Sequence, residues 1–213
     1  PPGYINNNPQ LKNASGTPVV TRGRGRDGAS SPAADWLYGY DPATGEELWK
    51  VKYGSLGFSI VPKPVVADGM VYIGTSFMRP QLLAFDITKP KPEIAWACKR
   101  SVPAVSSPLL VGGEIYFVSD SGGIVTCLDA KTGKKLWDGQ FPKHRASYYA
   151  SPTVADGKLY APREDGVIMV ASISVGFKLL SENNMGERII ATTVPVRDQL
   201  LIRGEKHLFC IAK

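Results

Sequence analysis

A repeat of about 44 residues constrains the fold of this chain more than any other feature. Three segments align almost without gaps, at residues 63–75, 107–119 and 151–163, and each joins two apolar runs through a turn. A weaker copy follows at 194–204, and an earlier trace begins at Pro18, 46 residues before Pro64. A fixed period of this length indicates supersecondary units that stack on their neighbours.

A second block recurs in phase with the first. Residues 37–49 and 125–137 each carry an aspartate, a Thr-Gly pair and a closing tryptophan, and residues 82–96 are the same block with a longer turn. The copy at 170–180 lacks both the aspartate and the tryptophan. The repeat positions are Asp41, Gly45, Trp49, Asp86, Trp96, Asp129, Gly133 and Trp137.

The apolar runs predict four short strands in each repeat. They are short, rich in Val, Ile, Tyr and Phe, and separated by turn sequences such as Asp68-Gly69, Gly112-Gly113 and Asp156-Gly157. Pairs of this kind between apolar runs are strong signals for tight hairpins. No segment predicts a helix. The expected fold is therefore all-β, a β-propeller of four-stranded antiparallel blades, with about four to five blades in this chain.

The period divides the chain into an irregular segment at 1–15 and a region of blades at 16–213. The approximate units are 16–57, 58–101, 102–145, 146–188 and 189–213. The last unit ends after its third strand, and the first 15 residues make a poor strand because they are rich in Pro and Asn. Since an exposed sheet edge is normally avoided, we expect this to be the C-terminal part of a larger propeller, closed by more N-terminal polypeptide or a second chain.

One tryptophan per unit predicts a packing role between blades, because a tryptophan side chain dominates the local energy of a core. Five small residues share another column of the alignment, namely Gly39, Ala84, Cys127, Ala171 and Cys210. Free cysteine behaves as a small apolar residue, so we expect Cys127 and Cys210 to fill a tight slot rather than to act in redox chemistry.

The Asp-x-x-Thr-Gly-x-x-x-Trp block resembles the pyrroloquinoline-quinone-like (PQQ-like) repeat. The resemblance covers the chain from about residue 16. It implies that the chain belongs to one of two branches of the PQQ-like family. Relatives of the outer-membrane assembly lipoprotein BamB are periplasmic scaffolds, whereas quinoprotein dehydrogenases hold PQQ and Ca²⁺ on the propeller axis. Both branches imply an extracytoplasmic, periplasmic or secreted, location.

The residues that quinoprotein chemistry would add are not recognisable. Dehydrogenases of that branch commonly place two adjacent cysteines over the cofactor, but the three cysteines here are far apart. Two isolated histidines give no metal motif, and neither a P-loop nor a G-x-S-x-G motif occurs. No catalytic residue is assigned, no cofactor or metal is expected, and PQQ with Ca²⁺ belongs only to the alternative.

Three functions remain open on the sequence. The first is a non-catalytic scaffold that binds a protein or polymer at a propeller face. The second is a fragment of a quinoprotein dehydrogenase. The third uses the net charge of +6 and the basic loop at 21–32 to bind an anionic surface through Arg22, Arg24 and Arg26. Nucleic acid is otherwise not an expected partner, and no run of the chain is long and apolar enough to span a bilayer.

Overall fold

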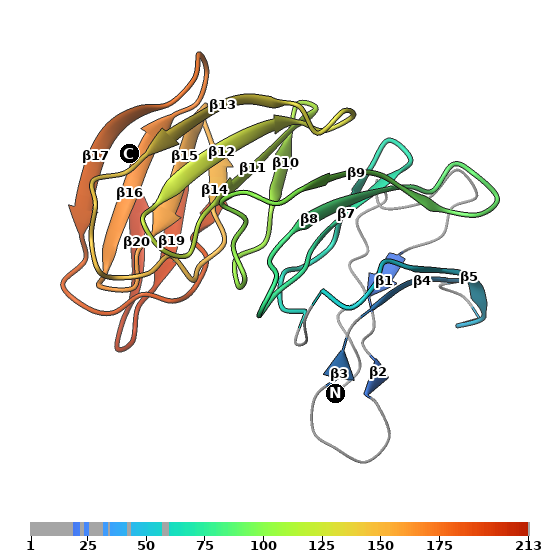
Figure 1. Cartoon of the computed structure of the whole chain (residues 1–213). Coiled ribbons are helices and arrows are strands. Elements are labelled where there is room, and N and C mark those ends of the chain that lie inside the picture. Colours follow the sequence, from blue (N-terminus) through green and yellow to red (C-terminus); the bar gives the residue numbers. More distant parts are fainter. Residues whose placement is uncertain are drawn as a thin grey trace. The chain divides into compact units, whose positions relative to one another are not determined.

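The computed structural model describes residues 35–41, 44–56 and 60–212, with the backbone of three further strand segments at 19–21, 24–25 and 32–33. Every regular element in this described part is a β-strand (Figure 1). The chain divides into two compact units, at residues 1–98 and 99–213. No helix in the described part has the length and hydrophobicity needed to cross a bilayer.

The first unit contains a three-stranded sheet, a short hairpin and a four-stranded sheet. The three-stranded sheet has the order β1 (Val19–Thr21), β4 (Trp36–Tyr40), β5 (Glu47–Lys52), and β2 (Arg24–Gly25) pairs with β3 (Pro32–Ala33). The four-stranded sheet is a meander of β6 (Val65–Ala67), β7 (Met70–Gly74), β8 (Leu82–Asp86) and β9 (Glu93–Cys98).

The second unit contains three antiparallel meanders. They are β10 (Leu109–Val111), β11 (Glu114–Val118), β12 (Ile124–Asp129) and β13 (Lys135–Gln140); β14 (Thr153–Ala155), β15 (Lys158–Pro162), β16 (Val167–Ser172) and β17 (Lys178–Asn184); and β18 (Val194–Val196), β19 (Gln199–Arg203) and β20 (Leu208–Ala212). These sheets are propeller blades, so the predicted all-β fold of four-stranded blades is confirmed.

The position of β1 corrects the sequence alignment. The trace at Pro18 suggested the first strand of a blade, but Val19 pairs with Gly39 in the same way that Tyr72 of β7 pairs with Ala84 of β8. The segment therefore takes the second-strand position. The basic loop follows it, so this loop connects the second and third strands of its blade through the β2–β3 hairpin.

Two recurrent turns hold the strands in register. The first is the two-residue hairpin between the first two strands. Asp68 and Gly69 have φ values of 49° and 73°, and Asp156 and Gly157 have φ values of 51° and 67°. These are the angles of a type I′ turn, which matches the twist of antiparallel strands. The predicted hairpins are therefore present.

The second turn is the aspartate motif between the third and fourth strands. The Asp129 carboxylate accepts hydrogen bonds from the backbone N–H of Thr132, at 2.7 Å, and from the Thr132 hydroxyl, at 2.6 Å. These bonds hold the pKa of Asp129 below its usual value. Gly133 has a φ of 70°, which glycine adopts without strain. The same turn recurs at Asp41 and Gly45, where the Thr44 N–H donates to Asp41 Oδ1 at 3.3 Å.

A row of three side chains crosses each complete blade. Cys127 pairs with Tyr116 on one side and with Trp137 on the other, and a β-bulge follows at once. Ala84 lies in the same way between Tyr72 and Trp96. The slot is narrow: a Cβ added to Gly39 would lie 2.2 Å from the indole of Trp49. Small residues are needed here because the large neighbours close over them.

The structure corrects this column at two positions. In the fourth repeat the residue that pairs with Tyr160 and precedes the bulge is Val170, not Ala171, because the preceding turn is one residue shorter. Cys210 keeps its position but is exposed, since β20 pairs only with β19 in the described part of the chain. Cys127 is buried, and burial raises the pKa of its thiol to about 12.

Two tryptophans pack between neighbouring blades, as expected from the repeat. Trp49 contacts a buried cluster that includes Val71 and Phe85 of the next sheet. Trp137 contacts a second cluster, to which β15 and β16 contribute Leu159 and Met169. Both indoles are half-buried rather than fully enclosed.

Candidate functional site

In the second unit, the turns between second and third strands lie at the same end of the sheets as the linkers between blades. The linker at 141–152 is held between two such turns: the Tyr148 N–H donates to the Asp120 carbonyl at 2.9 Å, and the Glu164 N–H donates to the Ser147 carbonyl at 2.8 Å. The linker at 185–193 is held similarly, because the Glu205 N–H donates to the Arg188 carbonyl at 3.1 Å. We call the β11–β12, β15–β16 and β19–β20 turns and these two linkers the turn face.

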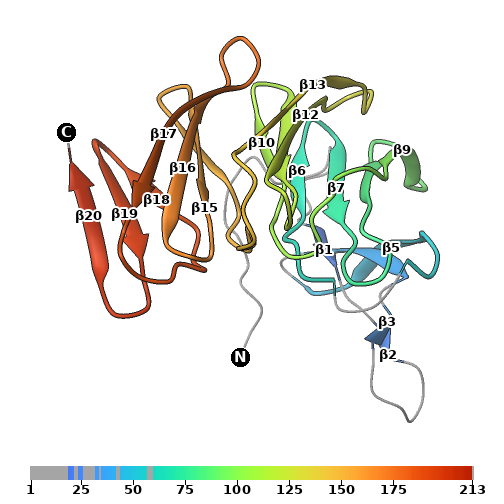
Figure 2. The same ribbon diagram turned by 60° about the vertical axis from the view of Figure 1, so that its left-hand side comes forward.

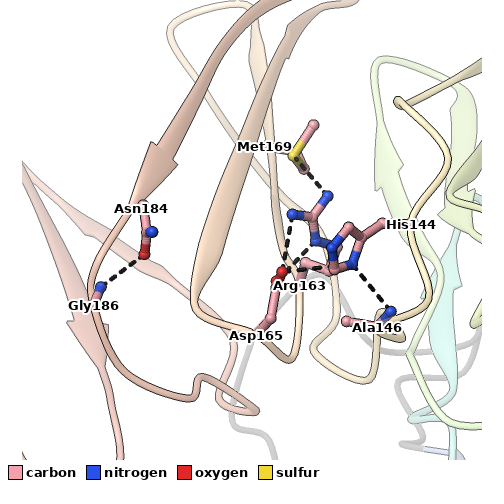
Figure 3. A network of polar contacts seen from close by, with 7 residues as sticks. All are labelled: His144, Ala146, Arg163, Asp165, Met169, Asn184 and Gly186. Carbon is pink, nitrogen blue, oxygen red and sulfur yellow. Dashed lines mark hydrogen bonds and ion pairs between the residues drawn. The ribbon is translucent and has the colours of Figure 1, made fainter.

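A buried arginine organises the centre of the turn face (Figure 3). Arg163 is only 5% exposed, and its guanidinium donates to both oxygens of Asp165, at 2.8 and 3.0 Å. These charge-assisted bonds are the main reason that the pKa of Asp165 is lowered. A carboxylate with a lowered pKa is a weak proton acceptor, so this pair is suited to holding the turn rather than to general base catalysis.

His144 completes this network. Its Nδ1 accepts a hydrogen bond from the Ala146 N–H at 3.1 Å and lies 3.5 Å from the Asp165 carboxylate (Figure 3). Since Nδ1 is the acceptor for Ala146, it carries no proton in that arrangement. His144 is therefore held by the linker backbone, beside the Asp165 carboxylate.

A polar cavity of about 460 Å³ opens beside this network, lined by Ala146, Glu164, Asp165, Asn184, Gly186, Glu187 and Arg188. Its charged groups are paired with one another, with Arg163 or with backbone. Arg188 donates to Glu164, with Nε at 3.1 Å, and Glu187 accepts the N–H groups of Lys206 and His207, each at 3.0 Å. Among the residues that the structure describes, no group of three or more His, Cys, Asp or Glu side chains could hold a metal ion.

The first unit carries a different kind of surface, on the β7–β8 loop at residues 75–81. Phe77 and Met78 at its tip are 59% and 68% exposed, and Met78 has a φ of 84°. Such an angle is an outlier for a bulky side chain, and backbone strain of this kind is common at binding sites. Thr75 is fully buried and fastens the loop: its hydroxyl donates to the Arg79 carbonyl at 2.8 Å and accepts the Gln81 N–H at 2.8 Å.

The residues singled out from the sequence lie elsewhere. The turns that carry Asp41, Asp86 and Asp129 join third and fourth strands, which places them at the opposite end of each blade from the turns between second and third strands. Arg24 lies in β2, and its side chain, like Arg22 and Arg26, is outside the described residues. The sequence reasoning passed over Glu164, Glu187, Arg188 and Phe77. Glu164 and Phe77 lie in connections between second and third strands, whose length varies from unit to unit, whereas Glu187 and Arg188 lie in the linker at 185–193.

Comparison with known proteins decides the family. A family model described as outer membrane protein assembly factor BamB matches residues 33–210. The chain belongs to this family of PQQ-like repeat proteins. A comparison with curated proteins finds no match.

Solved structures share the fold of this PQQ-like chain. BamB from Moraxella catarrhalis superposes with a TM-score of 0.65 at 18% identity, over 91% of this chain and 53% of that one. A quinohemoprotein alcohol dehydrogenase from Pseudomonas putida HK5 superposes with a TM-score of 0.66 at 14% identity, over 92% of this chain and 39% of that one. The computationally designed Ika8 protein superposes with a TM-score of 0.69 at 13% identity, over 93% of this chain and 58% of that one. The chain thus spans about half the length of the BamB structure, and these likenesses establish the fold alone.

The Arg163–Asp165 pair leads to a pH-dependent prediction. We expect Asp165→Asn to lower the free energy of unfolding at pH 7 by about 1–3 kcal/mol, because a buried guanidinium loses its counter-charge. The folded state holds the pKa of Asp165 low, so the stabilisation is complete above the unfolded value of about 4 and is lost as the pH falls below it. Urea unfolding of both proteins between pH 7 and pH 3 should show the difference narrowing toward acid.

The matched control for this pair is Asp138→Asn. Asp138 also forms an ion pair, with Lys135, but both side chains are more than half exposed. An exposed pair contributes little, so we expect a change below about 0.5 kcal/mol at every pH. Equal losses in the two variants would contradict the structural role given to Asp165.

Proposed function

We propose that this PQQ-like chain is part of a non-catalytic propeller that binds a partner protein. The β7–β8 loop carries the proposal. Large apolar side chains at the tip of a fastened loop lose little conformational freedom on binding, and such exposed apolar anchors are typical of interaction sites. The family match adds weight, since the matching model is described as an assembly factor.

The turn face supports binding in preference to turnover. Asp165, Glu164 and Glu187 are all engaged by Arg163, Arg188 or backbone N–H groups. A catalytic base works best when its pKa is near the working pH, whereas the Arg163 guanidinium lowers the pKa of Asp165. The quinoprotein alternative has the fold of the alcohol dehydrogenase in its favour, which is a weak warrant for activity. An extracytoplasmic location follows from the same family proposal.

Site-specific crosslinking in the full-length protein, in its own host, tests the binding function. A photo-reactive amino acid at Phe77 should give one discrete, reproducible adduct with a second protein. The same group at Lys131, an exposed residue of the β12–β13 turn, is the control and should give none. Replacing Met78 by Ser in the Phe77 crosslinking protein should weaken the adduct at least several-fold.

The opposing result is equally concrete. If purified full-length protein given PQQ and Ca²⁺ reduces a dye with an alcohol or an aldose as substrate, the non-catalytic proposal is wrong. Crosslinking from Phe77 that resembles crosslinking from Lys131 would remove the β7–β8 loop as the binding site.

A further inference from the structure

The fourth repeat lacks the tryptophan that closes three other blades, and the strand register shows which residue stands in its place. Trp137 is the partner of Cys127, and Cys127 is the partner of Tyr116. The corresponding row in the next blade runs from Tyr160 through Val170 to Ser181. Ser181 therefore occupies the tryptophan position.

The neighbouring blade still presents an apolar wall to this position. The cluster beneath Trp137 includes Leu159, Ala161 and Ala171 of β15 and β16. The strand register places Leu200, Ile202 and Ile211 of β19 and β20 at the corresponding positions. Thus β17 carries Ser181 in place of an indole, while the apolar residues of β19 and β20 that would contact this indole are still present.

A cavity lies at this position, where three other repeats have an indole. It measures about 370 Å³ and is lined by Tyr160, Val170 and Ser181 on one side and by Leu200, Ile202 and Ile211 on the other, and Met185 and Ile168 also line it. The sheet of β15, β16 and β17 and the sheet of β19 and β20 are neighbours (Figure 2), and residues of both line the cavity. This volume is within the range of small-molecule sites, and an apolar lining with a few polar groups is typical of them.

The polar groups lie toward the open side of this cavity. Ser181 and Asn183 are exposed, and the Asn183 side-chain amide donates to the Ser181 hydroxyl at 2.9 Å. Lys158 also lines the cavity, and its ammonium lies 2.8 Å from the Asp156 carboxylate. The cavity therefore has an apolar floor and a mixed rim, because the exposed Leu180 and Ile211 line it as well.

We propose that this cavity binds a planar aromatic molecule of indole size. The chain fills the same position with an indole in three other repeats. In two of them the indole packs against the tyrosine of its row at a centroid distance of 5.8 Å, tilted by 40° or 55°. Tyr160 is the equivalent tyrosine and lines the cavity, so an aromatic ligand reproduces a contact that the repeat already uses. This site is separate from the partner-binding loop and does not depend on it.

Titration with indole tests the proposal on the whole chain, with binding followed by isothermal calorimetry or by NMR shifts of Tyr160 and Val170. The wild type should bind saturably. Ser181→Trp should bind at least tenfold more weakly and unfold at a higher temperature, because the new indole occupies the cavity from within. Lys178→Trp, which adds an indole at an exposed residue of the same strand that does not line the cavity, is the control and should keep wild-type binding.

Two further measurements keep the test decisive if Ser181→Trp does not fold. Tyr160→Leu keeps the floor apolar but removes the ring contact, and it should weaken indole binding several-fold. Cyclohexanol, an aliphatic probe, should bind at least several-fold more weakly than indole. No saturable indole binding to the wild type, or equal binding by cyclohexanol, would overturn the proposal.

Discussion

Trp137→Ala should destabilise the chain by about 3 kcal/mol, measured by urea unfolding of wild type and variant under the same conditions. Truncation of a buried tryptophan typically costs about 3–5 kcal/mol, and the half-buried position of Trp137 places it at the lower end. The loss arises because the indole packs against the buried cluster shared by two blades. It also packs against the ring of Tyr116, with the two ring centroids 5.8 Å apart.

Leu136→Ala provides the control, because Leu136 is the preceding residue of β13 and is 46% exposed. Leu136 is not among the residues of the cluster that Trp137 contacts, so this change leaves the contact between blades intact. We expect a loss below about 1 kcal/mol, as is usual away from a core. A loss for Trp137→Ala as small as this would mean that the tryptophan does not join the blades.

Gly166→Ala should have an effect of similar size through a different mechanism. Gly166 lies in the β15–β16 turn with a φ of 94°, and a Cβ there would stand 2.0 Å from the carbonyl oxygen of Glu187. The left-handed angle alone costs about 1–2 kcal/mol for alanine. The clash is with backbone and cannot be relieved by a rotamer change, so steric strain of about 1–3 kcal/mol adds to the conformational cost, and a total of about 2–5 kcal/mol is expected.

Gly176→Ala separates these two causes. Gly176 has a φ of 79°, but a Cβ there would meet nothing within 4 Å. This variant should therefore show only the conformational penalty, about 1–2 kcal/mol by thermal or urea unfolding. If the two variants lose the same stability, the close approach of Gly166 to the linker is not important for folding.

The sequence was sufficient to predict the strands and turns of a blade, but it was not sufficient to predict the candidate site. The 44-residue period, the Asp-Gly hairpins and the Asp129 motif are local signals, because each turn is determined by residues next to one another in the chain. Arg163 and Asp165 also belong to one turn, two residues apart. Arg188 could not be assigned in this way, because its partner Glu164 lies 24 residues earlier and meets it only when the linker is folded against the turn.

The errors of register have one physical origin. Alignment by sequence placed Ala171 beside Cys127 because the two are 44 residues apart, but pairing in a sheet follows turn lengths rather than sequence distance. The same reasoning misplaced β1, where a proline and two valines looked like a first strand. The absence of a tryptophan near 180 was visible in the sequence. The structure was needed to show that this absence leaves a cavity, because the facing wall is formed by residues of β19 and β20.

The shortened β15–β16 turn sets a rule for exchanging parts between repeats. Tyr116 and its partner Cys127 are 11 residues apart, whereas Tyr160 and Val170 are 10 apart. The following connection restores the phase, with Cys127 and Trp137 separated by 10 residues but Val170 and Ser181 by 11. A chimaera joined within β12 or β16 by the 44-residue alignment would shift the strand by one residue and turn its side chains to the opposite face. Junctions placed at paired residues, such as Tyr116–Cys127 and Tyr160–Val170, preserve which side chains reach the neighbouring blade.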